Sequence, residues 1–276
     1  MPGATSACSG AATSYLPPKL ADVQADIAPG RIARPSETGR LALVSRVLLD
    51  ALGSVTPAGA TPRVLDCGGG SGAFAVPLAR AGAQVTVVDI SADALATLRR
   101  RAAEAGVGDV VRGLAAEVES LADAVGGDRF DLVLAHGILG AVDDVAAAFA
   151  AITAAVRPGG LLSLLIANPV AAVVARALAG DVDLALVELR ELVAVRDAGA
   201  EFGASPAGLL RLCASSGLLV ESRRGIGVFS DLVPGAALDT PAAREALAEL
   251  DREAAALDPY VDLAGRMHLL VRRPAG

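Results

Sequence analysis

A cluster of glycines that follows a short apolar run constrains this chain more than any other feature of its sequence. The run covers residues 63–66, ends in Asp66, and is followed by helical spacing over residues 73–81. The glycines between them are Gly68, Gly69, Gly70 and Gly72. Glycine has no Cβ atom, so it adopts positive φ angles and lets the backbone approach a ligand closely. A glycine loop between a strand and a helix is typical of the ligand-binding turn of an open α/β sheet.

Strand and helix patterns alternate along the rest of the chain. Seven apolar runs predict strands, over residues 63–66, 84–89, 110–111, 130–136, 161–167, 218–229 and 265–272. Helical spacing is found over residues 37–52, 73–81, 91–105, 145–156, 170–178, 184–195, 207–216 and 242–257. Such alternation indicates βαβ units and a parallel sheet. We predict an α/β fold with a Rossmann-like, seven-stranded, mostly parallel sheet, helices on both faces, and an antiparallel last strand at the sheet edge.

The chain is organised as one domain with an arm and an insert. Residues 1–35 lack periodicity, which predicts a flexible N-terminal arm. Residues 36–274 are predicted to form a single domain with its core at residues 60–168. Residues 169–204 break the strand–helix rhythm with two helices, so we expect a helical lid after the fifth strand. Residues 205–274 are expected to complete the sheet.

Charge and hydropathy exclude several classes of function. The 276 residues carry 24 Lys and Arg against 31 Asp and Glu, and the net charge of -7 argues against bulk nucleic-acid binding. The longest uncharged run, residues 158–175, is interrupted by prolines and glycines, so we expect no membrane span. The first ten residues hold no basic region and no apolar run, so no signal peptide is predicted.

Cysteine and histidine are scarce. The 3 cysteines form no C-x-x-C pair, and the chain has 2 histidines. A disulfide framework or a zinc knuckle is therefore not expected, and a reducing cytoplasmic setting fits. We predict no metal site.

Two cofactors compete for the glycine loop. Residues 68–73 satisfy the loose G-x-G-x-x-A form of the dinucleotide fingerprint. However, the carboxylate of Asp66 would repel a pyrophosphate, whereas it suits a ligand that carries an ammonium group. S-adenosyl-L-methionine has an ammonium, a sulfonium and a ribose but no phosphate, so electrostatics favours it over NAD. Asp89, at the end of the next strand, is placed to accept hydrogen bonds from the ribose hydroxyls, and its neighbour Ile90 is a further candidate cofactor-binding residue.

Four motifs resemble, in order and spacing, those of class I S-adenosylmethionine-dependent methyltransferases. They are Asp66-x-Gly68-x-Gly70-x-Gly72, Asp89, Phe130-Asp131-Leu132-Val133-Leu134 and Arg157-Pro158-Gly159-Gly160. The resemblance implies that Asp66 and the glycine loop hold the methionine end and that Asp89 holds the ribose. It also implies that Ala116 and Glu117 flank the adenine and that His136 faces the methyl group.

A narrower resemblance extends over almost the whole chain. The segments at residues 134–139, 161–164, 225–231 and 258–268 are similar to the bacterial tRNA carboxymethoxyuridine methyltransferases, which esterify a carboxylate on a wobble uridine. Where that subgroup has an Arg and a His, this chain has Gly227 and Ser230, and its insert is of mixed charge rather than Lys-rich. Cations are needed to hold an anionic tRNA. We therefore expect a small-molecule acceptor rather than tRNA.

Five residues are candidates at the acceptor. His136 could act as a general base for a hydroxyl or amine, or could form a hydrogen-bonding wall of the pocket. Arg40, Asn168, Arg223 and Arg266 are candidate substrate-binding residues. Arg223 and Arg266 could equally be surface charges that form ion pairs.

The sequence leads to one principal hypothesis and three alternatives. The principal one is an S-adenosylmethionine-dependent methyltransferase that acts on an oxygen or nitrogen atom of a small molecule. The alternatives are a tRNA wobble-uridine carboxyl methyltransferase, a non-catalytic S-adenosylmethionine-binding module and, more distantly, an NAD oxidoreductase.

Overall fold

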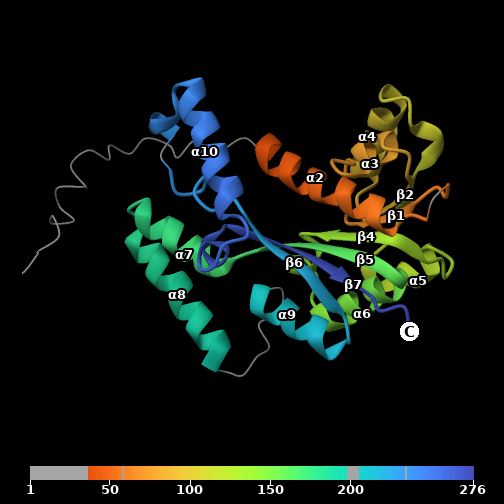
Figure 1. The fold of residues 1–276 in the computed structure, drawn as a ribbon. Coiled ribbons are helices and arrows are strands. Elements are labelled where there is room, and N and C mark those ends of the chain that lie inside the picture. Colours follow the sequence, from red (N-terminus) through yellow and green to blue (C-terminus); the bar gives the residue numbers. More distant parts are fainter. Residues whose placement is uncertain (1–36, 58, 198–204, 234) are drawn as a thin grey trace, which may run out of the picture.

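The computed structural model describes residues 37–57, 59–197, 205–233 and 235–276 (Figure 1). The predicted N-terminal arm and residues 198–204 of the predicted lid lie outside these ranges. Within them, no helix is both long enough and apolar enough to cross a membrane.

One sheet of seven strands forms the centre of the described structure. The strands are β1 (Arg63–Cys67), β2 (Gln84–Asp89), β3 (Val111–Ala115), β4 (Phe130–His136), β5 (Val156–Ala167), β6 (Leu219–Ile226) and β7 (Arg266–Arg272). Their order is β3-β2-β1-β4-β5-β7-β6. The first five strands pair in parallel, and β7 is antiparallel to both β5 and β6. The predicted seven-stranded, mostly parallel sheet with an antiparallel last strand is confirmed.

Helices cover both faces of the sheet and its carboxyl end. They are α2 (Glu37–Val55), α3 (Ala75–Arg80), α4 (Ala92–Glu104), α5 (Leu121–Ala124), α6 (Val145–Ala155), α7 (Pro169–Leu178), α8 (Val182–Asp197), α9 (Pro206–Ser215) and α10 (Pro241–Ala254). One apolar cluster joins α2, α3 and α4 to the sheet, and a second joins α5, α6 and α9 to it. In Figure 1 these two sets lie on opposite faces, while α7, α8 and α10 gather at one end.

The last strand does not lie at the edge of the sheet, so that part of the prediction is wrong. β7 lies between β5 and β6, and β6 forms the edge. The burial of the two strands gives the reason. Residues 267–271 of β7 are all buried, whereas the first three residues of β6 are exposed. A strand that is apolar on both faces needs a neighbour on each side and a helical layer on each face.

The fifth strand begins earlier than predicted, at Val156 rather than at residue 161. The segment Arg157-Pro158-Gly159-Gly160 is part of β5, which begins at Val156. The pairing with β4 shifts between Phe130 and Leu132, so these residues form a bulge rather than a turn. Gly159 has a φ of 74°, a conformation that glycine allows there.

An ion pair at the amino end of the sheet ties four elements together. The Arg157 Nε atom lies 2.6 Å from Asp131 Oδ1, and the Arg157 Nη2 group donates to the carbonyl of Val55 at the end of α2. The other carboxylate oxygen of Asp131 accepts from the backbone N–H of Arg63, at the start of β1. Both carboxylate oxygens are therefore used, and α2, β1, β4 and β5 are held at one point. This explains why an acid and an arginine occur in the third and fourth motifs.

We predict that Asp131→Ala lowers the free energy of unfolding by about 2–3 kcal/mol, because it removes the carboxylate partner of a partly buried guanidinium and leaves the backbone N–H of Arg63 without its acceptor. Asp128→Ala is the matched control, since Asp128 forms an exposed ion pair with Arg63. It should cost less than about 1 kcal/mol. Urea unfolding of both variants measures the difference, and equal losses would contradict the assigned role of Asp131.

Candidate active site

The glycine loop turns from β1 into α3 at the carboxyl end of the sheet. The N–H of Gly68 donates to the carbonyl of Val88 on the neighbouring strand, at 2.7 Å. Gly72 has a φ of 80°, and a Cβ atom there would lie 2.3 Å from Leu98 of α4. Helix α4 also holds the loop from outside, because Arg101 donates to the carbonyl and the hydroxyl of Ser71. The loop is therefore fixed by packing before any ligand binds.

Asp66 is buried behind this loop. Its side chain is 1% exposed, and Oδ2 has no hydrogen-bond partner among the described residues. A Cβ atom on Gly69 would lie 2.5 Å from the carboxylate, so only glycine fits there. Burial, with a smaller contribution from Asp89, raises the pKa of Asp66 to about 7. A buried acceptor without a donor indicates a site that a donor group can complete.

Asp89 ends β2 and organises the next part of the loop. Its Oδ2 accepts from the N–H of Gly70 and its Oδ1 from the N–H of Ser91, both at 2.8 Å. The side chain of Ser91 in turn caps α4 by accepting from the N–H of Ala94. The carboxylate thus stands at a defined position in front of the loop.

A cavity of about 500 Å³ opens beside these residues. Six of the predicted cofactor residues line it: Gly68, Asp89, Ile90, Ala116, Glu117 and His136. The other four, Asp66, Gly69, Gly70 and Gly72, do not line it and instead build the loop behind Gly68. Ile90 is 74% exposed, which is unusual for so large an apolar side chain.

The wall of this cavity is acidic. The charged residues that line it are Asp89, Glu117, Glu119 and Asp143, and no Lys or Arg is among the lining residues described. A pyrophosphate would meet repulsion from every charged group there, whereas a cationic ligand would be attracted. Sequence reasoning missed Glu119 and Asp143. Glu119 follows β3 and Asp143 follows β4, and the sequence analysis had already placed residues at the carboxyl ends of both strands in the site. Acidic residues in the loops after residues 115 and 136 were therefore the signal that could have identified them.

His136 belongs to a row of three polar side chains. Its Nε2 lies 2.8 Å from the hydroxyl oxygen of Ser163, which lies 2.7 Å from Nε2 of His268. The ring of Phe74 packs edge-on against His136, with ring centroids 4.6 Å apart. Burial and the neighbouring His268 hold the pKa of His136 well below its ordinary value. Burial and Arg224 lower the pKa of His268 to about 4. Sequence reasoning did not connect Ser163 with either histidine.

A second cavity of about 460 Å³ lies between α7, α8 and α9. Two of the predicted substrate residues, Asn168 and Arg223, line it together with mostly apolar side chains such as Leu189, Leu192 and Leu210. The amide of Asn168 donates to the carbonyls of Asp262 and Ala264, and its oxygen caps α7. Arg223 forms ion pairs with Asp258 and Asp262.

The remaining two candidates lie elsewhere. Arg266 begins β7, opposite Ala167 and Ile226, and is partly buried. Arg40 lies in α2, but its side chain is outside the described part of the structure. Within the described ranges, no three His, Cys, Asp or Glu side chains are grouped so that they could hold a metal ion.

Comparisons with known proteins find similarity to methyltransferases. Residues 65–164 match the family model described as a methyltransferase domain. The chain is 27% identical over 212 residues to the tRNA 5-carboxymethoxyuridine methyltransferase of Escherichia coli (strain K12), covering 77% of this chain and 80% of that protein. It is 41% identical over 112 residues to the ubiquinone biosynthesis O-methyltransferase of Methylobacterium sp. (strain 4-46), covering 41% of this chain and 43% of that relative.

Solved structures share the fold at low sequence identity. One is geranyl diphosphate C-methyltransferase from Streptomyces coelicolor A3(2), in complex with Mg2+, geranyl diphosphate and S-adenosyl-L-homocysteine. It is 18% identical with a TM-score of 0.53, and the match covers 84% of this chain and 79% of that one.

We predict that Asp66→Asn stabilises the ligand-free protein at pH 8. In the folded state the pKa of Asp66 is raised from its ordinary 3.8 to about 7, so the folded state favours the protonated acid. The resulting penalty is absent below the unfolded pKa and complete above pH 7, where it reaches about 4 kcal/mol at most. The neutral amide does not carry this penalty.

Unfolding in urea at pH 8 should therefore show Asp66→Asn to be more stable than the wild type, and the gain should disappear near pH 4. Asp50→Asn, an exposed acid on α2, is the control and should change stability by less than about 0.5 kcal/mol at both pH values. A loss of stability at pH 8 on replacing Asp66 would show that its carboxylate is satisfied in the free protein.

Proposed function

This chain is a class I S-adenosylmethionine-dependent methyltransferase, and we propose that it transfers the methyl group to an oxygen or nitrogen atom of a small, largely apolar acceptor. The second cavity carries this proposal. Its volume of about 460 Å³ is that of a small-molecule site, and its walls are mostly apolar. Arg223, the one Lys or Arg among its described lining residues, is already paired with two carboxylates.

The first cavity and the glycine loop behind it fit S-adenosylmethionine. From behind the loop, the unpartnered carboxylate oxygen of Asp66 would receive the ammonium group at the methionine end. Asp89 would accept from the ribose hydroxyls, and the exposed side chain of Ile90, with Ala116 and Glu117, would flank the adenine. The bound cofactor supplies an electrophilic methyl group on its sulfonium.

The two cavities lie at neighbouring strand ends. His136 ends β4 and lines the first cavity, while Asn168 directly follows β5 and lines the second. β4 and β5 are paired, with His136 opposite Leu165, and paired strands are about 5 Å apart. An acceptor in the second cavity would therefore have its reactive atom directed toward the methyl group from the adjacent strand. Helices α7 and α8 would cover it and exclude water, which is the task we assign to the insert.

A tRNA wobble uridine is the second candidate acceptor. The observation that favours it is the similarity to the Escherichia coli tRNA enzyme, which extends over 80% of that protein. Charge argues against it, because the chain has a net charge of -7 and the cavity beside Arg223 offers no unpaired cation among the residues described. Binding of tRNA depends on contacts of basic side chains with phosphates.

We predict that binding of S-adenosylhomocysteine weakens as the pH falls below about 7. The product carries the same ammonium group, which binds the ionised form of Asp66, and the raised pKa makes that form scarce below pH 7. Kd should rise by up to about tenfold per pH unit below that value. Calorimetry in two buffers of different ionisation enthalpy should detect release of a proton on binding near pH 7. In Asp66→Asn both the pH dependence and the proton release should be lost.

The acceptor is tested by label transfer. Purified protein is incubated with methyl-labelled S-adenosylmethionine and either tRNA that bears carboxymethoxyuridine or a panel of apolar small molecules with hydroxyl, carboxyl or amine groups. We expect label in the small-molecule fraction. Label that enters tRNA alone would overturn the proposed acceptor.

Two variants of α8 connect that activity to the second cavity. Leu192 lines the cavity and Leu186, on the same helix, does not line it and is 43% exposed. Leu192→Trp should fill the cavity and raise the KM for the acceptor at least about tenfold, while Leu186→Trp should leave it unchanged. The affinity for S-adenosylhomocysteine should be the same in both variants. Equal effects of the two substitutions would place the acceptor elsewhere.

A further inference from the structure

Three strands present polar side chains that lie in a row on one face of the sheet. His136 is on β4, Ser163 on β5 and His268 on β7, and the two distances between their polar atoms are 2.8 and 2.7 Å. The strand register places these positions diagonally across adjacent pairs, because Ser163 is opposite Leu134 and Leu270. This is the face covered by α2, α3 and α4, since Leu134 and Leu270 belong to that apolar cluster.

The hydroxyl between the two rings restricts where their protons lie. A serine hydroxyl has one hydrogen to donate, and it accepts through its lone pairs. Both rings are neutral at neutral pH, since burial holds both pKa values below the ordinary value. Each ring then carries one N–H. Among the described residues the hydroxyl of Ser163 has only these two rings as partners, so its hydrogen is satisfied only if Ser163 donates to one Nε2 and accepts from the other. The two histidines are therefore in opposite tautomers.

Two arrangements are possible. In one, Ser163 donates to Nε2 of His136, and His136 carries its N–H on Nδ1. In the other, Ser163 donates to Nε2 of His268, and His268 carries its N–H on Nδ1. Nδ1 of His136 and Nδ1 of His268 are both buried with no partner among the described residues. His268 is 0% exposed and lines neither cavity described above, whereas His136 lines the acidic cavity. An N–H that is buried without an acceptor is rarer in proteins than an unused lone pair. An N–H on Nδ1 is therefore better placed on His136, which is only partly buried, than on His268.

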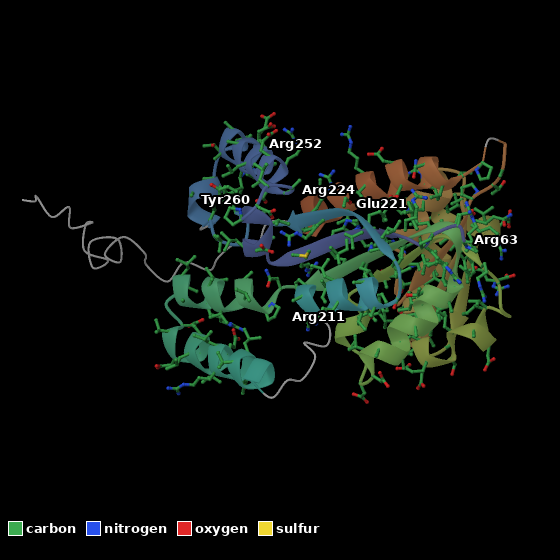
Figure 2. The ribbon with its side chains drawn as sticks, turned by 60° about the horizontal axis from the view of Figure 1, so that its bottom comes forward. Arg63, Arg211, Glu221, Arg224, Arg252 and Tyr260 are labelled. Atoms are coloured by element: carbon green, nitrogen blue, oxygen red, sulfur yellow. The ribbon has the colours of Figure 1, made fainter. Side chains whose placement is uncertain are left out.

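Arg224 favours the same arrangement. It lies on β6 directly opposite His268 in the antiparallel pairing, and its position on the strand is labelled in Figure 2. The Nε atom of Arg224 is itself buried without a partner among the described residues. A guanidinium beside an imidazole attracts the lone pair of the ring and repels an N–H. The unprotonated nitrogen of His268 is therefore best placed at Nδ1, with its proton on Nε2 directed at Ser163.

We propose that Ser163, His268 and Arg224 hold His136 in the Nδ1–H tautomer, so that it lines the cofactor cavity without acting as a general base. Nε2 of His136 then accepts from Ser163, and Nδ1 is buried and protonated, so neither nitrogen is free to take a proton from an acceptor. Ser163, His268 and Arg224 are positioning residues. The tautomer is a property of the free protein, and only the absence of a general base in turnover rests on the proposed function.

Long-range 1H–15N NMR of the ligand-free protein, labelled with 15N-histidine, tests the tautomers directly. The chain has 2 histidines, so the spectrum contains two rings, and loss of one set of signals in His268→Gln or His136→Asn assigns them. We expect the Nδ1–H form for His136 and the Nε2–H form for His268 at pH 7.5. An Nε2–H form of His136, an imidazolium, or an average of tautomers in either ring would overturn the proposal. No acceptor is needed, so failure of the proposed function does not affect this result.

A variant tests the absence of a general base once an acceptor is found. The side-chain amide of asparagine cannot take a proton at neutral pH. His136→Asn should retain kcat within about tenfold of the wild type, and the pH profile of kcat should keep its shape. A general base would instead be lost in this variant, and its pKa would disappear from the pH profile of kcat.

Ser163→Ala gives the control for positioning, because it removes the bridge and leaves both rings in place. In the NMR spectrum it should change His136 from one tautomer to a mixture. If His136 keeps a single Nδ1–H tautomer without Ser163, then the bridge does not set it and the proposal fails.

Discussion

The burial of one carboxylate behind a glycine loop is the constraint on which this site depends. Asp66 lies near the end of the central strand β1, where burying a neutral side chain would cost less free energy than burying a carboxylate. A Cβ atom on Gly69 would collide with that carboxylate. Its pKa near 7 means that the free protein keeps the group only partly ionised at neutral pH. In the function we propose, the cationic cofactor would relieve this cost by supplying the missing donor. The same group that weakens the empty fold would then supply affinity and charge selectivity to the occupied one.

The acidic wall extends this selection beyond one residue. Asp89 is held by two backbone N–H groups and fixes the front of the loop, while Glu117, Glu119 and Asp143 surround the opening. Negative charge on every side accounts for a cofactor with a sulfonium and an ammonium rather than one with phosphates. The second cavity differs in kind, because its walls are mostly apolar and its arginine is neutralised by Asp258 and Asp262. In the function we propose, the first cavity would select its ligand by charge and the second would select the acceptor by shape.

Much of this arrangement follows from local patterns in the sequence. The strands at residues 84–89 and 130–136 have the bounds that their apolar runs predict, because periodicity and flanking turn residues agree there. The edge of the sheet was harder to predict, since a continuous apolar run shows that β7 is buried but not which strands pair with it. The bulge at Pro158–Gly160 looks like a turn in sequence, and only its pairing with β4 and the chain end reveals a strand. Contacts between distant residues, such as Ser163 with two histidines, leave no local pattern.

The position of β7 also determines what the candidate site can do with protons. Were β7 at the edge beyond β6, His268 would be separated from Ser163 by a strand, and His136 would end a row of two polar groups. Inserted antiparallel between β5 and β6, β7 brings a histidine from the end of the chain next to Ser163 and sets Arg224 opposite it. Residues more than 120 positions from the glycine loop thereby influence the proton on a ring that lines the cofactor cavity. The antiparallel strand β7 thus helps to determine the tautomer of His136, a residue at the carboxyl end of the parallel strand β4.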